Sequence, residues 1–341
     1  MKKLLVLGLA ALMSLSVFAF VGCDGGETPP DDGTHTHSYV DGICECGKYE
    51  AAFLSMLPMA PDLQATCDQQ GTLEEFTYTA RAYALEEAEG TGEEIVVEKK
   101  AQVYLPYGYD DSKEYNILYL MHGGGETYTY WLSDMGMTTR NVLDNMIKAG
   151  KCEPVIVVAP TYESPAEGHE GMADWTTYFW EEFRNDLVPA VESEYSTYAG
   201  GDVSEENLIA TRDHRGFAGF SMGSITTIRV MMNCTDICGY YGSYSAGLYA
   251  DKDGADAWVE VKEALTSDAL KDYKVDYWFN MSGTADIALE PHQQLRDAAM
   301  ADPDGLFKDG SNYAWIVVPG GSHAYNCWVM GLYNSLLVFY K

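Results

Sequence analysis

The chain has 341 residues, of which 52 are acidic and 21 are Lys or Arg, so its formal net charge at pH 7 is −31. This acidity argues against nucleic acid or an anionic membrane surface as a partner, because both carry charge of the same sign. The length and a hydrophobic share of 47 % suit one large domain with a substantial core.

The N-terminal segment, residues 1–22, has the pattern of an export signal. Two lysines precede a long apolar stretch that runs from residue 4 to residue 21, which predicts a secretory signal and not a membrane-spanning helix. Gly22 precedes Cys23, and a small residue before a cysteine at this place resembles a bacterial lipoprotein signal. We therefore expect lipidation of Cys23 and a lipid-anchored protein on the bacterial cell surface, with plain secretion as the alternative.

Residues 23–34 are rich in Gly, Pro and acidic residues and predict a flexible tether. The next segment, residues 35–50, contains four side chains of the types that bind Zn²⁺, namely His35, His37, Cys44 and Cys46. Only one residue separates the members of each pair, which is tighter than in common zinc modules. Two interpretations stay open for this segment: a small zinc knuckle, or a linker without metal.

From residue 51 to residue 341 the pattern is that of one catalytic domain. The expected strands are 76–83, 95–105, 117–121, 154–160, 277–281 and 313–319, and the expected helices include 138–149 and 180–195. Residues 86–94 are expected to form an acidic turn between the first two strands. The fully apolar run 154–160 is typical of a parallel strand that is covered on both faces. Strands that alternate with helices indicate an α/β fold with a mostly parallel central sheet and helices on both faces.

Ser221 lies in the motif Gly219-Phe220-Ser221-Met222-Gly223, after a short apolar run and before a helix-like run. A serine between a strand and a helix in this motif is held on a sharp turn that exposes its hydroxyl group for attack on an acyl carbon. The motif occurs by chance in many chains, so the argument depends on whether the partner residues follow in the expected order.

Those partners are present in the expected order. His122-Gly123-Gly124-Gly125 follows the strand 117–121, and such glycines let backbone N–H groups face a developing oxyanion. Asp286 comes after the strand that begins at residue 277, and His323 comes after the last strand. The order of oxyanion loop, serine, acid and histidine is the order of the α/β-hydrolases.

The chemistry assigns a role to each of these residues. His323 is expected to take the proton of Ser221 and return it to the leaving alcohol, while Asp286 fixes the imidazole tautomer. The oxyanion hole is expected to use the N–H of Met222 and one N–H from Gly124 or Gly125. This chemistry requires no metal or organic cofactor, and it predicts activity that falls as His323 is protonated below about pH 6 to 7.

With these motifs in place, the sequence resembles carbohydrate esterase family 1, the feruloyl and acetyl-xylan esterases among the esterase-D-like α/β-hydrolases. The resemblance covers residues 73 to 340 and is carried by the segments 104–106, 122–125, 214–223, 282–286 and 320–323. It implies an α/β-hydrolase fold and hydrolysis of feruloyl or acetyl esters on plant xylan, a cell-wall polysaccharide. It also implies that Ser221, Asp286 and His323 form the triad.

Other titratable residues are expected to have structural roles. Asp276 competes with Asp286, but it stands at the start of its strand and so at the wrong edge of the sheet. The residues expected to support the backbone or to lie on the surface are His122, His169, His214, Arg215 and His292. Cys234 and Cys238 lie one helical turn apart, which is poor disulfide geometry, and are expected to be small buried residues.

The long polar segment 161–178 carries Trp175 and Tyr178, and Trp328 follows His323 closely. These three aromatic residues are expected either to offer a surface to a feruloyl ring or a sugar, or to pack the domain. Two other functions stay open beside the xylan esterase. One is an esterase or acyltransferase that acts on a siderophore or another small acyl ester. The other is a non-catalytic, glycan-binding surface lipoprotein.

Overall fold

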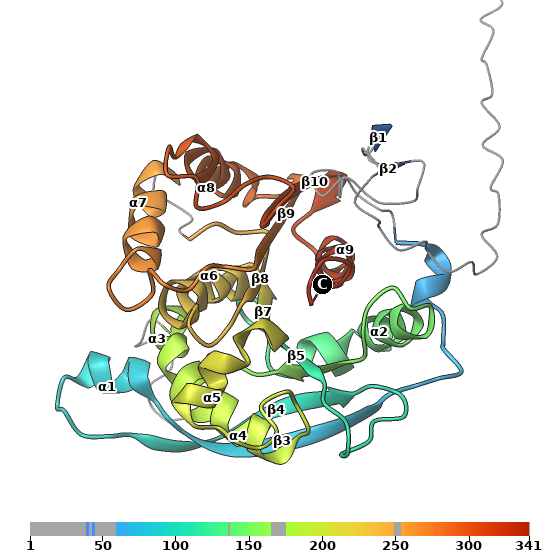
Figure 1. Ribbon diagram of the computed structural model, residues 1–341, viewed down its shortest axis with the longest axis horizontal. Helices are drawn as coiled ribbons and strands as arrows, with labels where there is room; N and C mark the ends of the chain where they lie inside the picture. Colours follow the sequence, from blue (N-terminus) through green and yellow to red (C-terminus); the bar gives the residue numbers. More distant parts are fainter. Residues whose placement is uncertain are drawn as a thin grey trace, which may run out of the picture.

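The structure is a computed structural model that describes residues 39–40, 43–44, 59–135, 137–164, 175–248 and 254–340. Its centre is an eight-stranded sheet in the order β10-β9-β8-β7-β5-β6-β4-β3 (Figure 1). The six strands from β10 to β6 in that order are parallel to one another. Strand β4 is antiparallel to both β6 and β3. The mostly parallel sheet expected from the sequence is confirmed.

The strands of this sheet are β3 (Thr72–Arg81), β4 (Val96–Leu105), β5 (Asn116–Met121), β6 (Val155–Ala159), β7 (Arg215–Phe220), β8 (Tyr240–Tyr244), β9 (Tyr277–Ala285) and β10 (Tyr313–Ser322). The α-helices are α1 (Tyr83–Glu89), α2 (Thr138–Lys148), α3 (Trp175–Glu182), α4 (Val188–Glu194), α5 (Glu205–Ala210), α6 (Met222–Cys234), α7 (Gly254–Leu265), α8 (Leu289–Ala301) and α9 (Tyr325–Leu336). Short helical turns are η2 (Pro61–Gln64), η3 (Tyr130–Asp134), η4 (Phe183–Leu187) and η5 (Arg212–His214). A small hairpin pairs β1 (Tyr39–Val40) with β2 (Ile43–Cys44).

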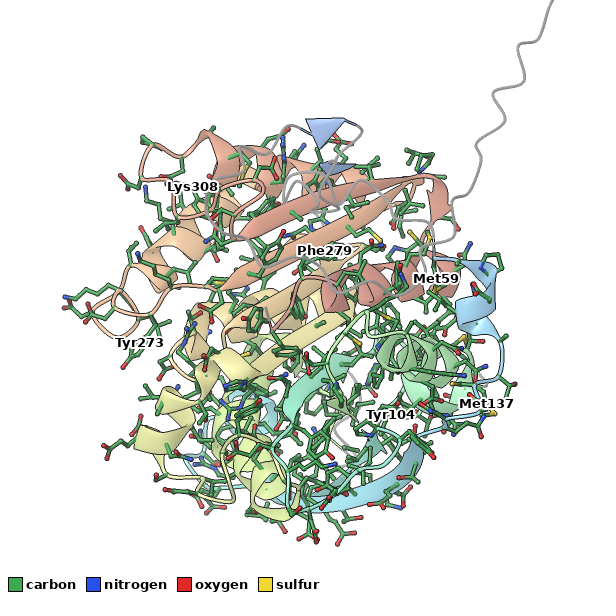
Figure 2. The ribbon with its side chains drawn as sticks, turned by 45° about the vertical axis from the view of Figure 1, so that its right-hand side comes forward. Met59, Tyr104, Met137, Tyr273, Phe279 and Lys308 are labelled. Carbon is green, nitrogen blue, oxygen red and sulfur yellow. The ribbon has the colours of Figure 1, made fainter. Side chains whose placement is uncertain are left out.

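Helices cover both faces of the sheet because side chains alternate along each strand. In β5, Ile117 and Tyr119 belong to one buried cluster, and Leu118 and Leu120 belong to the other. The first cluster packs under α3, α4, α6, α7 and α8, and the second packs under α2 and α9 (Figure 1). Figure 2 shows Phe279 and Tyr104 of the second cluster inside the molecule, while Lys308 lies at the periphery.

The central strands are buried along their whole length. Every residue of β5, β6, β7 and β8 is buried, including Asn116 and Arg215. This is the pattern of parallel strands that are covered by helices on both faces. It confirms the interpretation of the apolar run at residues 154–160.

Some expected element bounds were wrong. Of the expected acidic turn 86–94, residues 86–89 belong to α1, which begins at Tyr83 and is capped by Gly90 in the left-handed conformation (φ 61°). The end of the polar segment 161–178 is helical from Trp175, where α3 begins. Strand β9 continues to Ala285, because its later residues still pair with β10. Residue types alone do not show where a short helix begins or where a strand stops pairing, because both depend on tertiary contacts.

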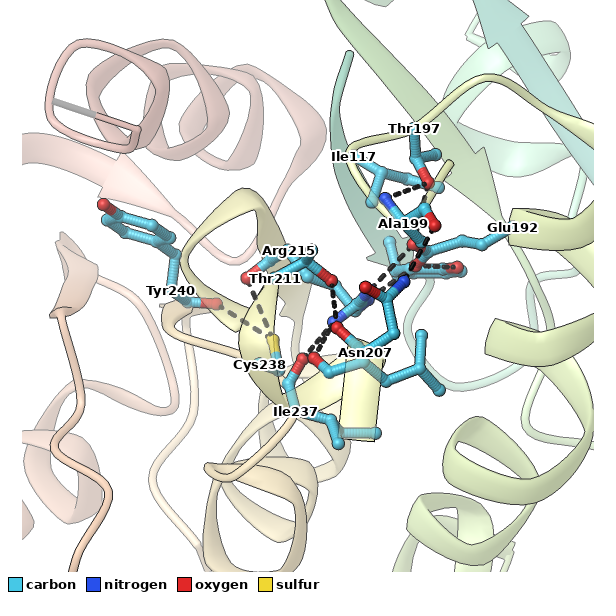
Figure 3. A network of polar contacts seen from close by, with 12 residues as sticks. Ile117, Glu192, Thr197, Ala199, Asn207, Thr211, Arg215, Ile237, Cys238 and Tyr240 are labelled. Carbon is cyan, nitrogen blue, oxygen red and sulfur yellow. Dashed lines mark hydrogen bonds and ion pairs between the residues drawn. The ribbon is translucent and has the colours of Figure 1, made fainter. Parts of the chain in front are cut away.

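Arg215, expected to be structural, begins β7 at the edge of the sheet where the parallel strands start. Its guanidinium donates two hydrogen bonds to Glu192 of α4, at 2.5 and 2.8 Å, and two more to the backbone carbonyls of Leu208 and Ile237 (Figure 3). The side chains of Arg215 and Glu192 are each 1 % exposed. These four hydrogen bonds reach α4, α5 and the loop before β8, so Arg215 ties all three segments to the sheet.

Several sequence predictions lie outside the described residues. These are the signal segment, Cys23, the tether, His35, His37, Cys46 and His169, and for Cys44 only the strand placement is described. None of the described helices combines the length and apolar character that crossing a membrane requires. Among the described residues, five cysteines are buried and not in disulfides: Cys67, Cys152, Cys234, Cys238 and Cys327.

Candidate active site

The turn between β7 and α6 holds Ser221 in an unusual backbone conformation, with φ 54° and ψ −121°. Such positive φ values are costly for a residue with a side chain and occur where the surrounding structure enforces them. The Ser221 N–H donates to the Tyr244 carbonyl at 2.9 Å, which fixes the turn on the neighbouring strand. A Cβ on Gly219 would lie 2.6 Å from the Gly223 oxygen, so the two motif glycines permit this close packing.

The hydroxyl of Ser221 lies beside His323. The Nε2 of His323 is 2.9 Å from Ser221 Oγ, and its Nδ1 is 2.8 Å from Asp286 Oδ1. The three residues come from the ends of β7, β9 and β10, which meet at the carboxyl edge of the parallel sheet. The structure therefore brings together the three side chains that the sequence singled out, in hydrogen-bond contact.

Asp286 is suited to remain ionised beside the imidazole. Its side chain is fully buried, and burial opposes ionisation, but hydrogen bonds from His323, Ser245 and the Ala288 N–H together hold the pKa of Asp286 below its ordinary value. Asp276, the competing acid, lies before the start of β9 and pairs with Arg212 at 3.0 Å. It is therefore at the opposite edge of the sheet, as expected.

Trp328 lies beneath the triad and not on an open surface. It is 5 % exposed, its indole stacks on Phe220 with ring centroids 3.8 Å apart, and its Nε1 donates to Ser245 Oγ at 2.9 Å. Ser245 follows β8 with a positive φ of 57°. Of the two interpretations left open for Trp328, this position favours packing of the domain, because helix α9 turns its ring into the core.

Two backbone segments frame the place where an oxyanion would form. Met222 is the first residue of α6, so its N–H has no acceptor within the helix and lies at the positive end of the helix dipole. Gly124 packs against Met222, since a Cβ on Gly124 would lie 2.8 Å from the Met222 Sδ. Gly125 follows with φ 83°, which a glycine adopts without strain.

His122, at the start of the glycine loop, is 1 % exposed. Its Nδ1 is 2.7 Å from the Gly123 carbonyl oxygen and its Nε2 is 2.8 Å from Thr161 Oγ1. Burial, assisted by the charge of Lys99, lowers the pKa of His122 to about 4, so the ring is neutral near pH 7. This position agrees with the structural role expected for His122.

A pocket opens beside Ser221 and His323. Its walls are mostly apolar and consist of Met222, Ile225, Ala246, Ile287, Ala288 and Pro291, together with Ser245 and the two catalytic candidates. Ile287 stands at its rim and is 84 % exposed. An exposed large aliphatic residue beside a reactive hydroxyl is a contact surface for an apolar ligand.

Trp175 and Tyr178 do not line this pocket. Both lie on α3 and line a separate hollow with Tyr83, Tyr162 and Glu182. Trp175 is partly buried against the cluster under α3. In the described residues these two aromatic side chains are thus not brought together with Ser221.

Four residues near the site were missed or misplaced by sequence reasoning: Ser245, Tyr162, Glu126 and His292. His292 was expected on the surface, but it is 1 % exposed and contacts Ser282 Oγ at 3.0 Å and Asn280 Oδ1 at 2.9 Å. It shares a helical face with Leu295 and Ala299, and this apolar spacing was the one available signal. Burial raises the pKa of the Glu126 carboxyl, which lies near His323.

Comparisons with known proteins give the family of this chain. A family model described as "Putative esterase" matches residues 92–337. The chain belongs to this esterase family. The resemblance to carbohydrate esterase family 1 noted in the sequence is confirmed.

Two curated relatives are longer than this esterase. Endo-1,4-beta-xylanase Y of Acetivibrio thermocellus is 35 % identical over 299 residues, which are 86 % of this chain and 25 % of that protein. Endo-1,4-beta-xylanase/feruloyl esterase of Xylanibacter ruminicola is 30 % identical over 161 residues, which are 45 % of this chain and 20 % of that protein. The esterase thus spans a quarter or less of the length of these two relatives.

A solved structure matches the fold of the esterase over most of both chains. The feruloyl esterase module from Clostridium thermocellum, complexed with sinapinate, is 33 % identical and superposes with a TM-score of 0.71. The match covers 84 % of this chain and 94 % of the module. The α/β-hydrolase fold expected from the motifs is confirmed.

Within the ranges that the structure describes, no group of three or more His, Cys, Asp or Glu side chains could hold a metal ion. The four candidate zinc ligands of residues 35–50 stand outside that search, because their side chains are not described.

Proposed function

We propose that this esterase hydrolyses feruloyl or related aromatic acyl esters on plant xylan, through an acyl-enzyme formed on Ser221. The observation that carries this proposal is the contact of Ser221 with His323 and of His323 with Asp286, beside an apolar pocket. The reaction uses only these side chains and backbone N–H groups, so it requires no metal or organic cofactor.

In the first half of the reaction, Ser221 Oγ attacks the ester carbonyl carbon while His323 Nε2 accepts the hydroxyl proton. The carbonyl oxygen becomes an oxyanion, which the N–H of Met222 and an N–H of the glycine loop stabilise. The carbon–oxygen bond to the sugar then breaks, and His323 gives its proton to the leaving alkoxide. Asp286 stays ionised and stabilises the transient imidazolium, in keeping with its lowered pKa.

In the second half, water replaces the sugar alcohol. His323 accepts a proton from water, whose oxygen attacks the acyl carbon, and the proton then returns to Ser221 Oγ as the acid leaves. The balance of the two halves is one ester and one water converted to one alcohol and one carboxylic acid.

The apolar pocket supports an aromatic acyl group over acetate. An acetyl group has one methyl to bury, whereas the walls from Ile225, Ile287 and Pro291 offer an extended apolar surface beside Ser221. Burial of apolar surface contributes about 25 cal/mol per Å², which favours the larger group. The relative named a feruloyl esterase and the module complexed with sinapinate support the same choice.

The test is a pair of initial-rate measurements, on methyl ferulate and on acetylated xylan, with the wild type and the Ser221→Ala variant. We expect ferulate release that depends on Ser221, with little acetate release. The opposite preference would make the enzyme an acetyl-xylan esterase. Labelling of Ser221 by a fluorophosphonate probe without turnover of either substrate would show that the ester lies outside xylan.

Export and the N-terminal segments are proposed from the sequence alone. We propose that residues 1–22 are removed, that Cys23 is lipidated, that residues 23–34 form a tether and that residues 51–341 form the catalytic domain. His35, His37, Cys44 and Cys46 are proposed as zinc ligands. Mass analysis of the N-terminal peptide and zinc content of the purified protein, each compared with a Cys23→Ala or Cys44→Ser variant, test the two points separately.

A further inference from the structure

The glycine loop contains one peptide unit whose orientation is set by two side chains. The carbonyl oxygen of Gly123 lies 2.7 Å from His122 Nδ1 and 2.8 Å from the hydroxyl oxygen of Tyr162. A carbonyl oxygen only accepts hydrogen bonds, so both the ring N–H and the phenolic O–H donate to it. Tyr162 is 3 % exposed, so this contact is shielded from water.

The planar peptide bond connects this carbonyl to the N–H of Gly124. In a trans peptide the C=O and the N–H point in opposite directions. Because two donors hold the Gly123 C=O on the side of Tyr162, the Gly124 N–H is directed to the other side. Gly124 packs against Met222, whose own N–H is the first donor of the oxyanion hole.

We propose that Tyr162 is a positioning residue for the oxyanion hole, which together with His122 orients the Gly123–Gly124 peptide so that the Gly124 N–H is the second donor. This rests on the proposed acyl-transfer function and deepens it, because the sequence left the choice between Gly124 and Gly125 open. Two hydrogen bonds to the carbonyl also polarise the peptide, which strengthens its N–H as a donor.

A buried chain of contacts keeps His122 in the required tautomer. With Nδ1–H donating to Gly123, the neutral ring has Nε2 as an acceptor, and Thr161 Oγ1 donates to it at 2.8 Å. The Thr161 carbonyl in turn accepts from Lys99 Nζ at 2.7 Å. Lys99 also pairs with Glu182 at 2.7 Å, and the two side chains are 1 % and 7 % exposed.

Tyr162 is held from several sides. Its ring packs on His122 with centroids 4.7 Å apart, and its hydroxyl lies 3.8 Å from the Met222 Sδ. The residue thus contacts both segments of the oxyanion hole, the glycine loop and the start of α6. A tyrosine that served only to fill the core would not need its hydroxyl at this junction.

The test is the Tyr162→Phe variant, which removes the donor and keeps the ring. Removal of a whole oxyanion donor costs about 10²–10³ in kcat, and a donor left misaligned costs part of that. We expect kcat on methyl ferulate and on 4-nitrophenyl acetate to fall about 10- to 100-fold, with KM within about threefold. The rate of labelling by a fluorophosphonate, whose adduct also places an oxygen in the hole, should fall in parallel.

The matched control is Tyr241→Phe. Tyr241 is also fully buried and donates to a backbone carbonyl, that of Cys238, at 2.8 Å, but it lies at the opposite edge of the sheet. It should lose comparable stability with little change in kcat. A second variant, Thr161→Val, leaves Tyr162 intact but removes the hydroxyl that donates to His122 Nε2. The His122 ring is then no longer held in the tautomer with Nδ1 protonated, and kcat should fall about 3- to 10-fold.

The outcomes separate this proposal from the proposed function. Wild-type turnover of 4-nitrophenyl acetate without turnover of methyl ferulate would overturn the substrate, and the Tyr162→Phe result would still decide the positioning role. An unchanged kcat and labelling rate in Tyr162→Phe, or an equal loss in Tyr241→Phe, would overturn the positioning role. A wild type that reacts with neither ester nor probe would overturn both.

Discussion

The ring of Trp328 stands edge-on against the imidazole of His323, with ring centroids 5.2 Å apart and an interplanar angle of 88°. The same indole donates its Nε1–H to Ser245 and stacks on Phe220, the residue before the nucleophile. One aromatic side chain of α9 therefore packs against His323 and against Phe220, which precedes Ser221.

This relationship predicts the effect of Trp328→Phe. The variant keeps an aromatic ring but leaves the buried Ser245 hydroxyl without its donor, so His323 should be less well positioned. We expect kcat on methyl ferulate to fall about 3- to 10-fold, and stability to fall by about 1–3 kcal/mol. The control is Trp258→Phe on α7. It removes a similar hydrogen bond, from the Trp258 indole N–H to the Asp302 carboxylate at 2.7 Å. Equal kcat losses in both variants would mean that Trp328 acts only through stability.

The proposed role of Asp286 predicts a large loss in Asp286→Asn. An amide in place of the carboxylate neither stabilises the imidazolium nor enforces the tautomer with Nδ1 protonated. We expect kcat to fall about 10³- to 10⁴-fold with KM little changed. Asp276→Asn, at the other edge of the sheet, should keep kcat within about twofold. Steady-state kinetics on purified, folded variants decide this, and a small loss in Asp286→Asn would remove it from the triad.

The exposed rim of the pocket predicts a change in acyl preference. Ile287→Ser removes apolar surface beside Ser221, and a loss of about 1 kcal/mol of contact corresponds to roughly a fivefold weaker interaction. We therefore expect KM for methyl ferulate to rise about fivefold while KM for 4-nitrophenyl acetate stays within about twofold. Val259→Ser changes another exposed aliphatic residue, on α7 and outside this pocket, and is the control. An equal change in KM for methyl ferulate and for 4-nitrophenyl acetate would mean that Ile287 does not contact the acyl group.

The buried His292 predicts a pH-dependent stability. Burial lowers the pKa of His292 to about 3, whereas an unfolded histidine titrates near 6.5. Below about pH 6.5 the unfolded chain takes up a proton that the folded chain does not, so stability falls as the pH falls.

From pH 7 to pH 5 this one residue should lower the free energy of unfolding by about 2 kcal/mol. In His292→Gln that contribution is absent, and the other titrating groups are common to both proteins. Urea denaturation at pH 7 and pH 5 measures the difference. Equal pH dependence in the two proteins would contradict the buried neutral state.

The Arg215–Glu192 pair predicts a strong effect on stability at a position far from the site. Arg215→Gln leaves Glu192 buried without its cation, which costs about 3–5 kcal/mol. Arg296→Gln breaks ion pairs in which the Arg296 side chain is 31 % exposed, and should cost at most about 1 kcal/mol. Chemical denaturation of both variants tests this, and equal losses would show that the buried pair adds nothing beyond a surface one.

Much of the fold and the central triad could be predicted from local patterns. The apolar run at residues 154–160 is a parallel strand because only a strand covered on both faces needs apolar residues at every position. Ser221 could be predicted because a sharp turn requires the glycines that flank it. His323 could be predicted because it follows the last strand, where the α/β-hydrolase order places the histidine. These signals depend on residues that are adjacent in the sequence, so they can be recognised without the structure.

Other residues had only a weak local signal or none. Tyr162 lies in a polar segment, yet it contacts Gly123 and Met222, which are far from it in the chain. His292 is polar and on a helix, and only its contacts with Asn280 and Ser282 of β9 explain its burial. For Trp328 the sequence left both a packing role and a surface role open, because proximity to His323 in sequence does not say which way a helix turns a ring.

Local sequence patterns were enough to predict the class of the fold, the sharp turn at Ser221 and the order of the catalytic candidates, because each depends on the conformation of a few consecutive residues. The tertiary structure was needed to place Trp175, Tyr178 and Trp328 away from the pocket beside Ser221, and to show which side chains hold the Gly123 carbonyl. These depend on hydrogen bonds and packing between segments about 40 to 100 residues apart, such as Asp286 with His323 and Tyr162 with Gly123. Distances across a folded sheet are set by all of its strands together, and no single stretch of sequence contains them.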